Sequence, residues 1–113
     1  MEKRQELQKR IEGRIDGLRR SIAALDVVVT GTLLLRRMVC GKSVCRCKKN
    51  KKWRHGPYHD WTRLENGRLV HKYLSPEEAE LVKRGIKNYR TLLKVSRQWE
   101  SETIRMMEVK KQN

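Results

Sequence analysis

The chain has 113 residues, a formal net charge of +15 at pH 7 and 37% apolar residues with no phenylalanine, which argues against a large globular core. The charge is concentrated, because residues 27–59 hold nine lysines and arginines and no aspartate or glutamate. Such a distribution is typical of a protein that binds a phosphate backbone. A merely solvated surface and attraction to an anionic membrane are the alternatives.

Nothing in the sequence indicates a targeting or membrane segment. The N-terminal residues lack the apolar stretch of a signal peptide. The longest apolar run, residues 27–35, is far shorter than the roughly 20 residues that span a bilayer. We therefore expect a cytoplasmic protein without a membrane partner, in which clustered cysteines are metal ligands or reactive thiols rather than disulfides.

Residues 2–26 are predicted to form an amphipathic helix. One narrow apolar stripe recurs at spacings of three and four residues, the width of a coiled-coil seam that needs a partner. Gly13 and Gly17 weaken this helix. The stripe consists of Leu7, Ile11, Ile15, Leu18, Ile22 and Leu25.

The middle of the chain is predicted to be β-structure. Residues 33–39 favour a short strand, with a helical turn as the alternative. Residues 57–74 favour a β-hairpin, because Asn66-Gly67 suits the positive φ angles of a tight turn and lies between two runs with aromatic and apolar residues.

A long helix is predicted from Ser75 to about residue 110. Ser75 and Glu78 form a capping box, and Pro76 is tolerated at the first helical position. Gly85 is a weak point near its start. The expected apolar seam runs through Val82, Ile86, Tyr89, Leu93, Ser96, Trp99 or Glu100, Thr103, Met106 and Val109.

These elements predict an α+β fold in three segments. Residues 1–26 are the N-terminal helix, residues 27–74 are a basic module with a zinc centre and a β-hairpin, and residues 75–113 are the long C-terminal helix. The two helices are expected to pair as an antiparallel coiled coil, or to form a homodimer with a second copy.

The candidate metal site lies in the middle segment. All three cysteines, Cys40, Cys45 and Cys47, are followed by His55, and this set can complete a tetrahedral Zn²⁺ shell. Nearby lysines and arginines favour the thiolate forms. His59 and His71 are alternative fourth ligands. The competing interpretation is that the cysteines pack as small apolar residues.

The same segment holds the candidate nucleic-acid site, with DNA favoured over RNA as the partner. Its cations are expected to contact phosphates, which gives a salt-dependent affinity with little specificity for the nucleotide sequence. The predicted contact residues are Arg36, Arg37, Lys42, Arg46, Lys48, Lys49, Lys51, Lys52, Trp53 and Arg54. Trp53, Tyr58 and Trp61 could stack on bases or form a small core, and the core is favoured for Tyr58 and Trp61.

The sequence leaves two other function classes to consider, an enzyme and an adaptor. A cysteine nucleophile with His55 or His59 as its base would make an enzyme, but the carboxylates are scattered and no glycine-rich phosphate loop is present, so no catalytic activity is expected. A protein-interaction adaptor that docks through its helices remains the main alternative to nucleic-acid binding.

The chain resembles a family of short prokaryotic proteins of unknown function, defined by a Cys-Gly-Lys-x2-Cys-x-Cys core followed by His-Gly-Pro-Tyr. The core matches at Cys40-Gly41-Lys42, Cys45-Arg46-Cys47 and His55-Gly56-Pro57-Tyr58. Further matches are Gly31-Thr32-Leu33, Gly67, Tyr73-Leu74, Glu77-Glu78 and Ile86-Lys87-Asn88-Tyr89-Arg90. The resemblance covers roughly residues 25–95 and implies an accessory of a mobile element, acting beside a transposase or recombinase.

Overall fold

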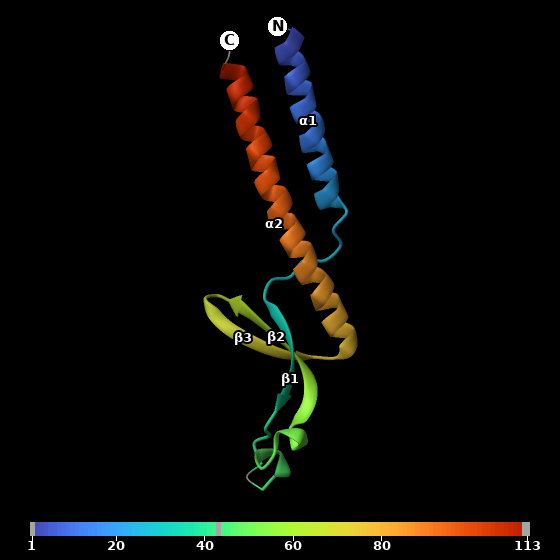
Figure 1. The fold of residues 1–113 in the computed structure, drawn as a ribbon, viewed down its shortest axis with the longest axis vertical. Helices are drawn as coiled ribbons and strands as arrows, with labels where there is room; N and C mark the ends of the chain where they lie inside the picture. Colours follow the sequence, from blue (N-terminus) through green and yellow to red (C-terminus); the bar gives the residue numbers. More distant parts are fainter. Residues whose placement is uncertain (1, 43, 112–113) are drawn as a thin grey trace. The chain divides into compact units, whose positions relative to one another are not determined.

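The computed structural model describes residues 2–42 and 44–111. In chain order the elements are α1 (Glu2–Ala23), β1 (Thr32–Met38), the short 3₁₀ turns η1 (Arg46–Lys48) and η2 (Lys51–Trp53), β2 (His55–Glu65), β3 (Arg68–Leu74) and α2 (Pro76–Lys111) (Figure 1). The predicted α+β class is confirmed. The chain forms two compact units, a helical unit of Met1–Val27 with Lys87–Asn113 and a sheet unit of Val28–Ile86. The division into three segments made from the sequence stays a prediction.

The sheet unit is built on three antiparallel strands in the order β1-β2-β3. The predicted strand after residue 32 and the predicted hairpin are both confirmed. Asn66 and Gly67 form the turn between β2 and β3 with φ angles of 51° and 78°, the left-handed conformation that a two-residue hairpin turn requires. The register places Trp61 opposite Leu33 on one side and Lys72 on the other.

One face of the sheet carries the apolar core of this unit. Leu74 lies against Ala79 and Val82 from the first turns of α2, and these three side chains are buried. Trp61 is half-buried at the edge of the cluster, and its indole nitrogen donates a hydrogen bond to the carbonyl of Thr30 at 2.9 Å. The core is small, as the composition predicts. The other half-buried members are Val29, Leu33 and Ile86.

The start of α2 is fixed by the capping box that the sequence predicts. The amide of Glu78 donates to the hydroxyl of Ser75 at 3.1 Å, and the amide of Ser75 donates to the Glu78 carboxylate at 3.1 Å. These hydrogen bonds from Ser75, with Lys72 nearby, hold the pKa of Glu78 below its usual value. Both partners therefore satisfy backbone donors that a helix start leaves unpaired.

Gly85 has a packing role that the sequence did not reveal. The amide of Val29 donates to the carbonyl of Gly85 at 3.2 Å, so the chain before β1 lies directly against this turn of α2. A Cβ atom at Gly85 would lie 2.8 Å from Cγ2 and 3.1 Å from the amide nitrogen of Val29. The residue that weakens the helix in isolation is the one that permits this close approach.

In the helical unit, α1 and the later turns of α2 run antiparallel and side by side, so that the start of α1 and the end of α2 lie at the same end of the unit (Figure 1). Ile11 is 1% exposed at the centre of the predicted α1 stripe. Arg14 pairs with Glu102 at 3.0 Å, and Asn88 donates from its side chain to the carbonyl of Val27 at 2.9 Å. The coiled-coil and dimer interpretations stay predictions.

The predicted seam of α2 is wrong in its middle part. Leu93, Ser96 and Thr103 are exposed, and the buried or half-buried stripe lies one residue earlier on the helix. The stripe recurs at spacings of three and four residues and includes one carboxylate. Its members are Leu92, Val95, Trp99, Glu102, Met106 and Val109. The helix has two neighbouring apolar stripes, and periodicity alone could not tell which one α1 covers.

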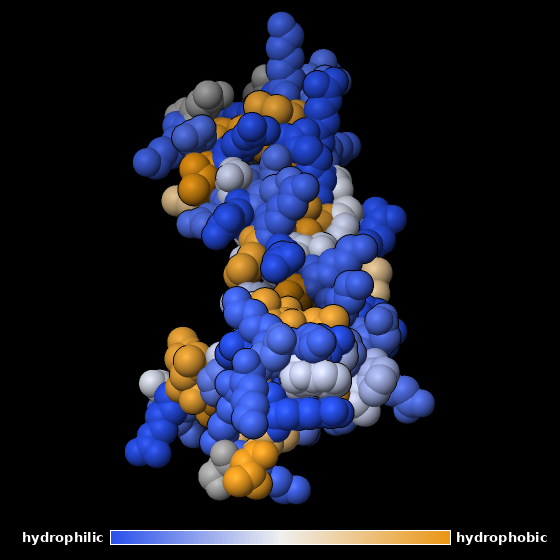
Figure 2. Space-filling view, turned by 60° about the horizontal axis from the view of Figure 1, so that its bottom comes forward, coloured by the Kyte–Doolittle hydropathy of each residue, from blue (hydrophilic) through white to orange (hydrophobic). Residues whose placement is uncertain are grey.

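The face drawn in Figure 2 is mostly hydrophilic, with separate hydrophobic patches. No helix within residues 2–42 and 44–111 combines the length and the apolar character needed to cross a bilayer.

We predict opposite effects of alanine at two helical glycines. Gly17→Ala adds a methyl group with no atom within 4 Å, so it should raise the free energy of unfolding by up to about 1 kcal/mol through helix propensity. Gly85→Ala gains the same propensity but collides with Val29, so it should lower stability by about 1 kcal/mol. Urea unfolding followed by circular dichroism measures both free energies. Equal stabilisation by the two substitutions would show that the packing of Val29 against α2 does not require a glycine at position 85.

Candidate metal centre

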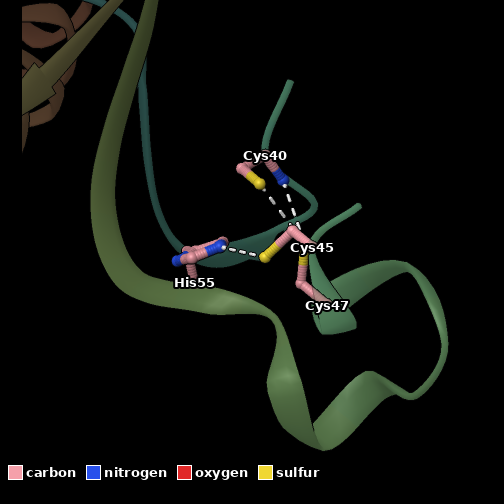
Figure 3. Close-up of side chains that lie close together, drawn as sticks. All are labelled: Cys40, Cys45, Cys47 and His55. Atoms are coloured by element: carbon pink, nitrogen blue, oxygen red, sulfur yellow. Dashed lines mark hydrogen bonds between the residues drawn. The ribbon is translucent and has the colours of Figure 1, made fainter. Parts of the chain in front are cut away.

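The four predicted metal ligands come from two neighbouring strand ends and the turns between them. Cys40 follows β1, and His55 is the first residue of β2. The antiparallel ladder pairs Met38 with His55, so the end of β1 and the start of β2 lie together. Cys45 and Cys47 are carried back to this point by η1. Figure 3 shows the side chains of all four residues converging.

The distances fit one ion. The ligand atoms of Cys40, Cys45, Cys47 and His55 all lie within 4.8 Å of one another. The sulfurs of Cys40 and Cys47 are 3.6 Å apart, and Sγ of Cys45 lies 3.3 Å from Nε2 of His55. A tetrahedral shell with metal–sulfur bonds of about 2.3 Å places sulfurs about 3.8 Å apart. The cluster can therefore hold a thiophilic metal ion.

Backbone hydrogen bonds position the cysteines. The amide of Cys40 donates to Sγ of Cys47 at 3.4 Å, and Cys47 is 2% exposed. The carbonyl of Cys45 accepts from the amide of Lys48 at 3.2 Å, which closes η1. An amide aimed at a sulfur stabilises the thiolate that a metal requires. Backbone hydrogen bonds thus orient Cys45 and Cys47 without the help of side-chain packing.

Cys45, the N-cap of η1, and Cys47, within it, have different acidities. The pKa of Cys45 is lowered to about 6, because the backbone amide of Cys47 donates to its sulfur and the His55 ring lies beside it. Burial raises the pKa of Cys47, which the hydrogen bond from the Cys40 amide only partly offsets. The lowered pKa favours the thiolate form of Cys45 at neutral pH, whereas the raised pKa of Cys47 makes its proton harder to remove when a metal binds.

The other two histidines lie outside this cluster. His59 is within β2, opposite Leu35 and Leu74. His71 is within β3, where its Nδ1 lies 3.3 Å from a carboxylate oxygen of Asp60. The structure therefore brings His55, and neither alternative, to the three cysteines.

The predicted nucleic-acid residues surround the metal centre on β1 and the loops. Arg36 and Arg37 are on β1, and Arg36 is paired with Asp60 at 3.1 Å. Arg54 is half-buried, whereas the remaining cations lie exposed in the loop before η1, on the two 3₁₀ turns and between them. These cations are Lys42, Arg46, Lys48, Lys49, Lys51 and Lys52.

Trp53 is 40% exposed and is covered by cations of its own loop. The guanidinium of Arg46 lies 3.9 Å from the ring centroid, and the ammonium of Lys52 lies 5.0 Å from it. A base could stack on Trp53 only in competition with these cation–π contacts. Trp61 belongs to the core as predicted, whereas Tyr58 is 42% exposed and lies outside the core cluster.

Sequence reasoning missed Asp60. This carboxylate is 1% exposed and contacts both Arg36 and His71. A lone aspartate between His59 and Trp61 in a predicted strand is the only signal in the sequence, and it does not indicate burial.

Comparison with known proteins adds a family but no function. A family model described as a domain of unknown function (DUF6788) matches residues 4–84. No curated protein and no solved structure matches the chain.

We predict that wild-type protein binds one metal ion per chain through these four side chains. Cys45→Ser combined with Cys47→Ser should abolish stoichiometric binding and disorder the loops, and His55→Ala should weaken it strongly. His59→Ala is the matched control and should keep the metal. Elemental mass spectrometry of purified variants measures the stoichiometry, while circular dichroism reports folding. A metal-free wild type, together with a folded double-serine variant, would contradict the assignment.

Proposed function

The chain belongs to the DUF6788 family, whose function is unknown, and we propose that it is a small zinc-stabilised protein that binds nucleic acid. The proposed role is binding rather than catalysis. It rests on one observation, which is that the exposed cations of residues 42–52 lie on the same short turns that carry the metal ligands.

The donor set favours zinc. Three thiolates and one imidazole are a common shell of structural Zn²⁺ sites, and four protein ligands leave no open position for a reacting water. Soft sulfur ligands select against magnesium and calcium. Zinc would therefore stabilise the loops and take no part in chemistry.

The charge arrangement favours a phosphate backbone. Lys48, Lys49, Lys51 and Lys52 are exposed on η1, η2 and the link between them. No carboxylate occurs in residues 27–59 to compensate them. Their clustering on a metal-held loop favours contacts to several adjacent phosphates, which give affinity without much sequence choice.

We extend the proposal to the biological setting that the sequence resemblance implies. The protein would be an accessory to the transposase or recombinase of a mobile element, with DNA as the favoured ligand. The Cys-Gly-Lys and His-Gly-Pro-Tyr motifs support this setting, and both frame the proposed metal site.

The alternative function is an adaptor that docks a protein partner through its helices. One observation favours it. The helical unit has an apolar groove of about 630 Å³, lined by residues of both stripes of α2 and by Ile22 of α1. The groove is lined by Ile22, Leu92, Leu93, Ser96, Trp99, Glu100, Thr103 and Ile104.

Charge reversal should separate the two functions. Glutamate at Lys48, Lys49, Lys51 and Lys52 should remove up to four phosphate contacts, which lowers the slope of log affinity against log salt by about three to four. The matched control reverses four exposed lysines of the helical unit, Lys3, Lys9, Lys87 and Lys94, and should change the slope much less. Fluorescence anisotropy with duplex DNA, single-stranded DNA and structured RNA at several salt concentrations measures the slopes.

Two outcomes would contradict nucleic-acid binding. One is a wild-type protein that binds none of the three ligands near physiological salt, which would favour the adaptor. The other is an equal loss in the loop variant and the helix variant, which would indicate attraction by net charge alone rather than a site on the loops.

A further inference from the structure

The sheet has a second face, on the side away from the core that it forms with α2. Side chains alternate across a strand, so the residues beside Leu33, Trp61 and Leu74 point away from the core. We call this side the open face. It carries Arg36 from β1, Tyr58, Asp60 and Thr62 from β2, and His71 and Tyr73 from β3.

Two aromatic rings stand on the open face. Tyr58 is 42% exposed and Tyr73 is 51% exposed, and their ring centroids are 5.8 Å apart at an interplanar angle of 54°. The hydroxyl of Tyr73 donates to the sulfur of Met38 at 2.9 Å, which helps to hold that ring in place. The rings are oriented by neighbours and yet accessible, as a stacking platform requires.

A buried carboxylate organises the polar groups around these rings. Asp60 is 1% exposed, and its two oxygens contact two different side chains, those of Arg36 and His71. Nη1 of Arg36 donates to Oδ2 at 3.1 Å, and Nδ1 of His71 lies 3.3 Å from Oδ1 and 3.0 Å from the Thr62 hydroxyl. The side chains of Arg36 and His71 are about half exposed, so Asp60 fixes their orientation without hiding them.

Charge identifies the class of ligand that fits. The only carboxylate among the open-face residues named above is buried and paired with Arg36. Tyr58 lies three residues after His55, and Arg36 lies four residues before Cys40, so the open face adjoins the basic loops. A second copy of the chain would bring its own +15 charge against this surface, which like-charge repulsion disfavours.

We propose that the open face binds unpaired bases of a single-stranded nucleic acid, which stack on Tyr58 and Tyr73 while the backbone continues to the cations of the metal-held loops. Aromatic side chains on a sheet surface stack bases in this way, and a duplex cannot offer its bases to them. Arg36 and His71, oriented by Asp60, contact phosphate or base edges beside the rings. This inference rests on the proposed function and makes it selective for single strands.

The test replaces the rings and keeps their apolar area. Tyr58→Leu with Tyr73→Leu should weaken binding of an oligothymidylate of about 12 nucleotides by about a hundredfold, since each stacked base contributes about tenfold. Binding of a duplex of equal length should stay unchanged. The matched control is Leu64→Ser with Leu69→Ser, because this exposed pair lies on the same face beside the hairpin turn, beyond the tyrosines, and should leave both affinities unchanged.

A second measurement locates the bound strand directly. An oligothymidylate with one 5-iodouracil should crosslink under ultraviolet light to Tyr58 or Tyr73, as mapped by mass spectrometry of peptides. Crosslinks confined to residues 40–55 would overturn the inference. Metal content and thermal unfolding of each variant establish that a lost affinity is not a lost fold.

The outcomes distinguish this inference from the proposed function. If wild-type protein binds neither ligand, both fail. If it binds both and the tyrosine variant keeps its single-strand affinity, or loses duplex affinity equally, only the open-face assignment fails. A dimer in light scattering that dissociates in the leucine variant would show that the open face binds a second copy instead.

Discussion

Electrostatic repulsion within the loops is the constraint on which the sheet unit depends. Residues 40–55 hold seven lysines and arginines, no carboxylate and, among those described, one buried side chain, Cys47. Such a segment cannot collapse by apolar burial, and its charges favour an extended chain. Three sulfurs and one imidazole lie within 4.8 Å, and their coordination to a metal ion would hold the loops together, because the thiolates supply the negative charge that the segment otherwise lacks.

The sheet determines where these four ligands meet. The β1–β2 ladder brings residue 38 opposite residue 55, so the two ends of the loop segment are held together by backbone hydrogen bonds. The same ladder carries Arg36 and Tyr58 out of the loops and onto the open face. The open face, the metal centre and the basic loops therefore lie along one continuous segment, from β1 through the loops to β2. A ligand that contacts all three needs no further domain.

Features set by neighbours in sequence could be predicted, and features set by distant contacts could not. The Asn66-Gly67 turn, the capping box at Ser75 and the cysteine cluster each depend on residues a few positions apart. His55, the fourth member of the cluster, follows Cys47 by eight residues. Burial of Asp60 and the packing role of Gly85 depend on partners more than ten residues away, which periodicity does not report.

The pairing of Arg14 with Glu102 has a consequence for how the two helices align. The Glu102 side chain is 12% exposed and interrupts an otherwise largely apolar stripe, so it lowers the free energy of one alignment only. Sliding α1 by one heptad, about 10 Å, would replace Arg14 by another residue and leave the half of the carboxylate that Arg14 contacts without its partner, while Arg105 of α2 would stay 3.5 Å from the other oxygen. An apolar residue at 102 would tolerate several registers. A single charge at this position thus gives the helical unit one register among many that apolar periodicity allows.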